Sequence, residues 1–465
     1  MWLLYLAIFW TGATWCHVNA AEKQADYSGY TLYRFKVDTS SNSMEKLESY
    51  DMELDTTTQT ARLLIDIWAE PSKQNPHADV LVAPEFLTKF RSLLTSAEIS
   101  TLKVLEGDIQ SQINAERRAM IHNAIRRRKR ALKTWSDFDA NVYHSYEEMT
   151  EFMRLLSEQK PDMVEMIKVA TSSEGRSIYG VKIHPPGPST PEKPSIIVDA
   201  GVHAREWIAP AVALFMIKKI VHEYGINPQV TANLQKFDWY IMPQVNPDGY
   251  EYSRTNDRLW RKTRSKNVTV NRWCVGADAN RNWGYRWGTV TQKNLERKKV
   301  FLGEAGANRT PCSNIYMGSH PYSEPEIRGL KEYFTWQITN PMVYISLHSY
   351  GQLLLSPWGY TNERTENYQD QQNAAKEAAQ AIKNTTGVSY SYGTISEMMY
   401  PASGTSIDFM QHRGVPYIYG VELRPTDNPN SFAFNLPPMF IKATGDEMMA
   451  ALNAIGTHAV KMKRL

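Results

Sequence analysis

Three apolar runs beyond residue 190 are each followed by a side chain that can bind a metal or carry a proton. Residues 195–198 lead into Asp199 and His203, residues 343–346 into His348, and residues 417–421 into Glu422. Short, continuous apolar runs are typical of strands buried on both faces. Open α/β sheets place their functional sites at the carboxyl ends of strands. We therefore expect an α/β fold in which these side chains meet at one edge of the sheet.

The rest of residues 131–465 agrees with this fold class. An apolar strand at 239–242 and helices at 209–224 and 373–383 alternate with the three runs. This order predicts a mixed, mostly parallel sheet with helices on both faces.

Residues 21–116 follow a different pattern, in which alternating strands surround short helices. The expected strands are 31–37, 63–69, 78–83 and 104–105, and the expected helices are 43–50 and 84–94. Such a pattern predicts a small α+β unit, an open sandwich of helices on an antiparallel sheet.

A run of five cations at 126–130 ends a polar, helical stretch that begins near Ile109. Residues 21–116 hold 9 Lys and Arg against 16 Asp and Glu, residues 117–130 hold 7 and none, and residues 131–465 hold 36 and 33. The basic run is either a solvated helix face or a protease-sensitive connector. The unequal distribution of charge among these three segments favours an acidic prodomain (21–116) and a connector (117–130) that an activating endoprotease cuts at Arg130. The working domain would then be 131–465.

The first 20 residues resemble a secretory signal peptide with cleavage near Ala20. Their apolar run is about 14 residues long, and a membrane-spanning helix needs about 20. An ordinary buried helix is the alternative. Removal of this segment would discard Cys16 and leave Cys274 and Cys312 as the only possible disulfide pair of a secreted, extracellular protein.

Composition excludes several classes of partner. The net charge of +3 gives no electrostatic case for nucleic acid, and no later run approaches 18 apolar residues, so we expect no membrane span. Sequons at Asn267, Asn308 and Asn384 are compatible with glycosylation.

His203 and Glu206 lie three residues apart, a spacing that permits both to bind one metal. That spacing alone is weak, because an isolated His–Glu contact is more often a surface hydrogen bond. Together with His348 they form a two-His, one-Glu zinc set that leaves a fourth position for water. Glu422 would then serve as the base, and Asp278 would hold the second ring nitrogen of His203.

Four arginines stand inside or beside these motifs. They are Arg205, Arg258, Arg261 and Arg281. A planar guanidinium suits a carboxylate, so arginines gathered at a metal site predict a carboxylate clamp and cleavage next to a free C-terminus.

Over residues 25–460 the sequence resembles the zinc metallocarboxypeptidases of the pancreatic A/B type, which are made with an activation domain. The resemblance rests on motifs at 201–207, 243–250, 258–262, 278–283, 347–350 and 421–424. It implies a carboxypeptidase-like fold, a zinc ion held by His203, Glu206 and His348, and peptide or protein C-termini as substrates. It also implies a disulfide between Cys274 and Cys312.

The resemblance further implies a role for each polar residue of the cleft. Glu422 would be general base and acid, and Arg261 would stabilise the oxyanion. Asn280, Arg281 and Tyr400 would bind the terminal carboxylate, and Arg205 would assist substrate binding.

Ile407 occupies the floor of the specificity pocket by the same resemblance, with Ile395, Met399 and Gly420 beside it. An apolar floor leaves a buried cation unpaired, so we expect release of aromatic or aliphatic residues, the A-type preference. Core packing is the alternative reading of Ile407. For the whole protein the alternatives are B-type cleavage of Lys or Arg and a catalytically silent C-terminus-binding protein.

One segment departs from the family pattern. Residues 289–303 have no counterpart in it and fall inside the expected disulfide loop. The segment forms a surface loop, or it changes access to the cleft, or it disturbs folding.

Overall fold

The computed structural model describes residues 24–38, 40–50, 52–55, 60–72, 75–128, 132–187, 193–266, 273–289, 306–426 and 432–463. The predicted leader 1–20, the cleavage site at Arg130, the sequon at Asn267 and residues 290–303 lie outside these ranges.

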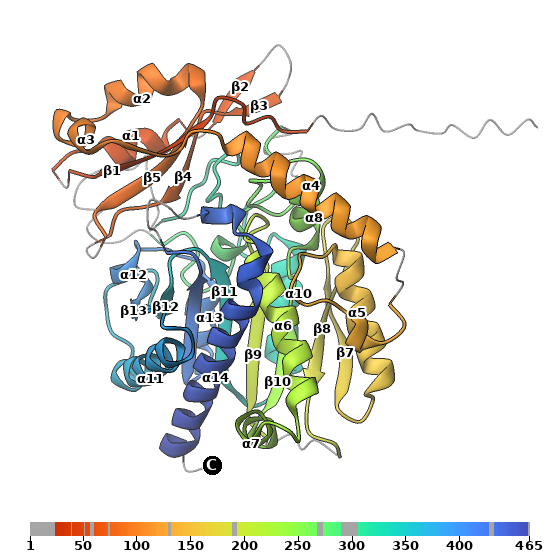
Figure 1. The fold of residues 1–465 in the computed structure, drawn as a ribbon. Helices are drawn as coiled ribbons and strands as arrows, with labels where there is room; N and C mark the ends of the chain where they lie inside the picture. Colours follow the sequence, from red (N-terminus) through yellow and green to blue (C-terminus); the bar gives the residue numbers. More distant parts are fainter. Residues whose placement is uncertain are drawn as a thin grey trace, which may run out of the picture.

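The N-terminal unit is an antiparallel sheet of order β4-β5-β1-β6 with short helices packed on it (Figure 1). This arrangement confirms the predicted open sandwich. Phe35, Val80 and Phe90 are buried in its core. Its elements are β1 (Thr31–Lys36), α1 (Ser43–Glu48), β2 (Met52–Asp55), β3 (Thr60–Leu63), β4 (Ile65–Ala69), β5 (His77–Val82), η1 (Pro84–Phe86), α2 (Leu87–Leu93), α3 (Ser96–Thr101) and β6 (Lys103–Glu106).

The strand expected at 63–69 was wrong in one respect. Leu63 ends β3, which pairs with β2 in a separate hairpin, and β4 begins at Ile65. Leu64 and Ile65 are both buried, so the alternation of buried and exposed residues is interrupted where the chain passes from hairpin to sheet.

The expected polar helix is α4 (Ile109–Arg128), which leaves the N-terminal unit and crosses the large domain (Figure 1). Ile109 and Ile113 pack in the N-terminal core, and Glu116 forms an ion pair with Arg258 of the large domain. The helix thus contacts both parts of the chain.

The large domain contains an eight-stranded sheet of order β13-β12-β14-β11-β9-β10-β8-β7. The four central strands β14, β11, β9 and β10 are mutually parallel, and antiparallel pairs occur toward both ends. The strands are β7 (Val164–Thr171), β8 (Ser177–Ile183), β9 (Ser195–Ala200), β10 (Asp238–Met242), β11 (Pro341–Ser349), β12 (Leu353–Ser356), β13 (Ser391–Thr394) and β14 (Tyr417–Leu423).

Helices cover both faces of this sheet, which confirms the predicted fold class. On β9, Ile196 and Val198 belong to one apolar cluster and Ile197 to another, because successive side chains point to opposite faces. The helices are α5 (Tyr146–Gln159), α6 (Ile208–Glu223), α7 (Pro228–Lys236), α8 (Pro247–Thr255), α10 (Pro325–Trp336), α11 (Tyr368–Thr386), α12 (Ile395–Met398), α13 (Ser406–His412) and α14 (Ile441–Lys463), with short 3-10 turns η2 (Trp135–Asp137), η3 (Ala279–Arg281), η4 (Ala433–Asn435) and η5 (Pro438–Phe440). Within the described ranges, none of these helices has the length and apolarity to cross a membrane.

A carboxyl group at the start of α10 makes the stability of the fold depend on pH. Glu326 is fully buried; its Oε1 accepts a hydrogen bond from Ser173 N at 2.8 Å, and its Oε2 has no partner among the described residues. Burial raises the pKa of Glu326 to about 7. In the unfolded chain the same group ionises near its ordinary value.

We expect the free energy of unfolding to fall between about pH 4.5 and pH 7, because the folded state holds the Glu326 proton longer than the unfolded state. Glu326→Gln should abolish this contribution, worth about 3 kcal/mol at pH 8. Urea titrations at pH 5 and pH 8 measure it, with Glu332→Gln on the exposed side of α10 as control. Parallel pH profiles for Glu326→Gln and the unchanged chain would contradict the assignment.

Candidate metal centre and substrate cleft

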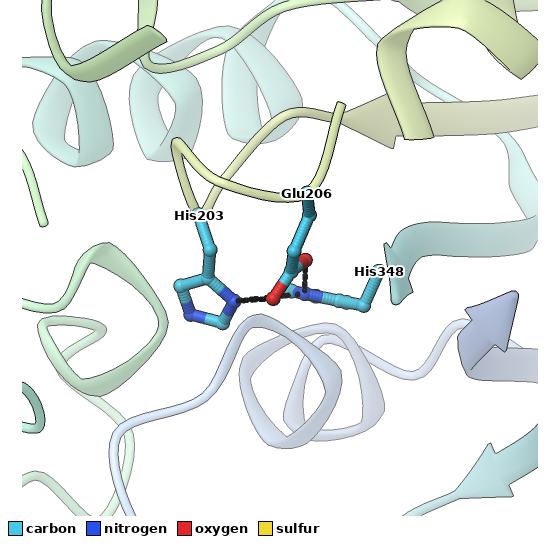
Figure 2. Close-up of side chains that lie close together, drawn as sticks. All are labelled: His203, Glu206 and His348. Atoms are coloured by element: carbon cyan, nitrogen blue, oxygen red, sulfur yellow. Dashed lines mark hydrogen bonds and ion pairs between the residues drawn. The ribbon is translucent and has the colours of Figure 1, made fainter. Parts of the chain in front are cut away.

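Three buried side chains converge at the carboxyl edge of the central strands. His203 and Glu206 come from the turn after β9, and His348 comes from β11 (Figure 2). Their ligand atoms all lie within 4.8 Å of one another. His203 Nδ1 is 2.8 Å from Glu206 Oε1, and His348 Nδ1 is 3.2 Å from both Glu206 Oε2 and His203 Nδ1.

The Nε2 atom of each histidine contacts a polar side chain on the far side of the ring from Glu206. His203 Nε2 lies 3.0 Å from Asp278 Oδ1, and His348 Nε2 lies 3.1 Å from Ser346 Oγ. Both Nδ1 atoms therefore face the shared space beside Glu206. Two imidazole nitrogens and one carboxylate are a donor set that suits zinc, so these residues fit the predicted metal.

Electrostatics keep the acids of this cluster ionised. Burial alone would raise the pKa of Glu206, but His203 and His348 outweigh it and hold the pKa below its usual value. Burial likewise opposes ionisation of Asp278, yet Arg261 and His203 lower its pKa well below the ordinary range. Arg261 donates to Asp278 Oδ2 from Nε at 3.1 Å and from Nη2 at 2.8 Å.

Glu422 lies opposite His348 in the pairing of β14 with β11, and it lines the same cleft. Burial raises the pKa of Glu422 to about 8, and the charge of His348 opposes that rise. A divalent cation nearby would also oppose the rise in the Glu422 pKa, since an opposite charge favours the ionised form.

Polar groups suited to an anion line the cleft near these residues. Arg281 donates from Nη2 to the hydroxyl of Tyr400 at 3.0 Å, and Asn280 Oδ1 accepts a hydrogen bond from Ser406 N at 3.0 Å. Arg261, Asn280, Arg281 and Tyr400 all line the cleft. Asn280 and Arg281 lie in η3, Arg261 lies in a loop before it, and Tyr400 lies in the loop after α12.

Arg258 does not join this group, which corrects the expectation drawn from its motif. It pairs with Glu116, donates to the Arg205 and Phe434 carbonyl oxygens at 2.9 and 2.6 Å, and stacks 3.8 Å from the centre of the Trp207 ring. Because its donors point to these partners, Arg258 is absent from the residues that line the cleft.

An apolar recess forms one side of the cleft. Ile407 is 1% exposed and lines this part of the cleft together with Ile395, Met399 and Gly420. Leu355 of β12 also lines it, a residue that sequence reasoning missed because β12 itself was not predicted. A β-carbon added at Gly420 would lie 3.6 Å from Ile407 Cγ1, so the missing side chain leaves room there.

Asp408 follows Ile407 but does not face the recess. Its carboxylate accepts hydrogen bonds from Gly359 N at 2.8 Å and Tyr360 N at 3.1 Å. Burial raises the pKa of Asp408 to about 7. This acid therefore holds a neighbouring loop, and the recess remains apolar.

The N-terminal unit covers the cleft. Asp66 forms an ion pair with Arg205 and accepts a hydrogen bond from Asn314 Nδ2 at 2.8 Å. Trp68 packs edge-on against Phe434 with ring centres 5.0 Å apart. Residues 66–70 thus form part of the cleft lining.

The disulfide between Cys274 and Cys312 is present, with Cα atoms 4.8 Å apart. Asn308, the first residue of one predicted sequon, precedes Cys312 by four residues and lines the cleft. Asn384 is exposed on α11.

Comparison with known proteins agrees with this geometry. The zinc carboxypeptidase family model matches residues 149–451, and the carboxypeptidase activation peptide model matches residues 52–116. The chain is 35% identical to carboxypeptidase A4 of Mus musculus over 396 residues, which cover 85% of this chain and 87% of the relative. It is 33% identical to carboxypeptidase A1 of Bos taurus over 443 residues, which cover 95% and 97%.

Solved structures give the same result. Carboxypeptidase A from Helicoverpa armigera superposes with a TM-score of 0.78 at 25% identity, over 94% of this chain and 99% of that one. Thrombin activatable fibrinolysis inhibitor (TAFI) superposes with a TM-score of 0.75 at 28% identity, over 93% and 98%. The chain belongs to the zinc carboxypeptidase family and carries that family's activation peptide.

Proposed function

We propose that this zymogen is secreted, is activated by cleavage at Arg130, and releases aromatic or aliphatic residues from peptide C-termini. One observation carries the proposal: a single cleft contains the His203, Glu206 and His348 cluster and Glu422. The same cleft contains the hydrogen-bonded pair of Arg281 and Tyr400 and the apolar recess. Each part supplies one requirement of the reaction.

His203, Glu206 and His348 would hold the zinc ion through two Nδ1 atoms and a carboxylate. When bound, zinc polarises a carbonyl group and acidifies water. Asp278 would keep His203 oriented by accepting a hydrogen bond from its Nε2–H. Arg261, which donates to Asp278, would keep the Asp278 carboxylate ionised.

Glu422 would take the proton of the attacking water and return it to the leaving amine. Arg261 would stabilise the oxyanion that forms on the substrate carbonyl, because it lies in the cleft with Nη1 3.8 Å from Glu206 Oε1. Both residues are only partly exposed, and an electrostatic contact is stronger there than in water.

Arg281, Tyr400 and Asn280 would bind the terminal carboxylate of the substrate. The guanidinium and phenol already lie 3.0 Å apart, so one carboxylate can accept from both. Arg205 would contact the next part of the peptide once Asp66 has left it.

Ile407 would set the A-type preference, because a cationic side chain in this recess would be buried without a partner. The absent side chain at Gly420 adds space that suits large aromatic residues. Limited proteolysis followed by assay on a peptide pair ending in Phe or Arg tests the proposal. Faster release of Arg would establish the B-type alternative instead.

We expect the uncut chain to have low activity, because the N-terminal unit occupies the cleft. Asp66→Asn should raise activity before cleavage about tenfold or more, since removing one partner of a buried ion pair costs about 3 kcal/mol. Hydrolysis rates before and after limited proteolysis measure this effect.

Asp38→Asn is the matched control, because Asp38 bonds to Ser40 within its own turn. An uncut chain as active as the cut one would refute the autoinhibitory role of the N-terminal unit.

A further inference from the structure

A second buried carboxylate stands behind the metal cluster, on the strand beside His348. Asp199 is 1% exposed and lies near the end of β9, directly opposite Ser346 of β11 in the strand register. Tyr344, Ser346 and His348 alternate along β11, so their side chains share one face of the sheet. That face carries a continuous line of polar groups from Asp199 to His348.

Both oxygens of Asp199 accept a hydroxyl proton. Ser346 Oγ donates to Oδ1 at 2.7 Å, and the Tyr344 hydroxyl donates to Oδ2. Ser346 has only one hydroxyl proton, and this geometry commits it to the carboxylate. Toward His348 Nε2, which is 3.1 Å away, Ser346 Oγ can therefore only accept.

His348 must then hold a proton on Nε2, so the neutral ring that binds a metal presents the lone pair of Nδ1 to the space beside Glu206 and His203. His203 also holds a proton on Nε2, but there Asp278 contacts the nitrogen directly, without a hydroxyl between them. A carboxylate thus orients His203 directly, whereas a carboxylate orients His348 through a serine hydroxyl.

We propose that Asp199 is a positioning residue for the metal centre, which fixes the ring orientation and tautomer of His348 through the hydroxyl of Ser346. This inference rests on the proposed zinc site. It assigns a role to a buried acid that contacts neither substrate nor metal ligand directly.

Tyr344 provides a matched control, because its hydroxyl bonds Asp199 but not His348. Zinc affinity of the full chain, measured by competition with a chelator, should fall at least about tenfold in Ser346→Ala and in Asp199→Asn. In Tyr344→Phe it should fall less than about threefold. Asparagine can donate to Ser346, whose proton would then turn toward His348 Nε2 and disfavour the required tautomer.

A spectroscopic readout separates positioning from loss of folding. In the zinc-loaded chain labelled with 15N-histidine, the Nε2–H proton of His348 should exchange slowly with water. Ser346→Ala should shift this signal and speed its exchange, and Tyr344→Phe should leave it in place. If Ser346→Ala is misfolded by circular dichroism, Asp199→Asn is judged by the same two criteria.

The inference is overturned if the serine variant binds zinc as tightly as Tyr344→Phe, or if the His348 signal is the same in both. If the unchanged chain binds no zinc, the proposed function itself fails. Weak zinc binding by Ser346→Ala and Asp199→Asn, beside tight binding by Tyr344→Phe and the unchanged chain, supports the link from Asp199 through Ser346 to His348.

Discussion

Replacing Glu422 by Gln should reduce kcat by about 10²–10⁴-fold and leave zinc bound. The amide keeps the size of the side chain but cannot take the proton of an attacking water, and general acid–base groups contribute about that factor. His203, Glu206 and His348 are untouched by the change, so the zinc content of the purified protein should stay at one per chain. Steady-state kinetics on the activated enzyme and elemental analysis measure the two quantities.

The matched control is Glu397→Gln on α12, the helix that also carries Ile395 of the apolar recess. Glu397 pairs with Arg364 on the outside of the domain, and it does not line the cleft. Turnover in this variant should stay within about twofold of the unchanged enzyme. Unchanged turnover in Glu422→Gln would mean that another group transfers the proton.

Replacing Ile407 by Asp should reverse the preference for the terminal residue. A buried cation that lacks a partner is disfavoured by several kcal/mol, and each 1.36 kcal/mol corresponds to a tenfold change in rate. We therefore expect kcat/KM for a peptide ending in Arg to rise by about 100-fold relative to one ending in Phe. Asp408 does not supply this charge in the unchanged chain, because its oxygens are bonded to Gly359 N and Tyr360 N.

Ile407→Leu controls for the loss of shape, since volume-conserving apolar exchanges are tolerated best. It should keep the preference for Phe. If Ile407→Asp remains selective for Phe although folded, then position 407 does not face the terminal side chain, and the assignment of the recess fails.

The fold class and the metal cluster were predictable because their signals are local. Buried parallel strands appear as short apolar runs, and the residues that follow them must meet where the strands end. His203 and Glu206 are three residues apart in the sequence, and His348 and Glu422 occupy paired positions near the ends of β11 and β14. The polar character of α4 was equally evident, because it depends on composition alone.

The individual contacts between the N-terminal unit and the large domain were not predictable. Asp66 and Arg205 are 139 residues apart, and their ion pair depends on how two separately folded units dock. Arg258 was expected at the cleft, but a partner in α4 and two carbonyl oxygens hold it elsewhere. No local pattern encodes the choice among such partners.

The sequence by itself thus determined which residues are available for chemistry and at which edge of the sheet they gather, since strand burial and side-chain alternation are properties of short segments. Only the tertiary structure decided how they are supported. The link from Asp199 through Ser346 to His348 exists because β9 and β11 pair in one particular register, and a shift of one residue would turn these side chains to the other face. The covered cleft likewise results from docking, which brings Asp66 and Trp68 onto Arg205 and Phe434.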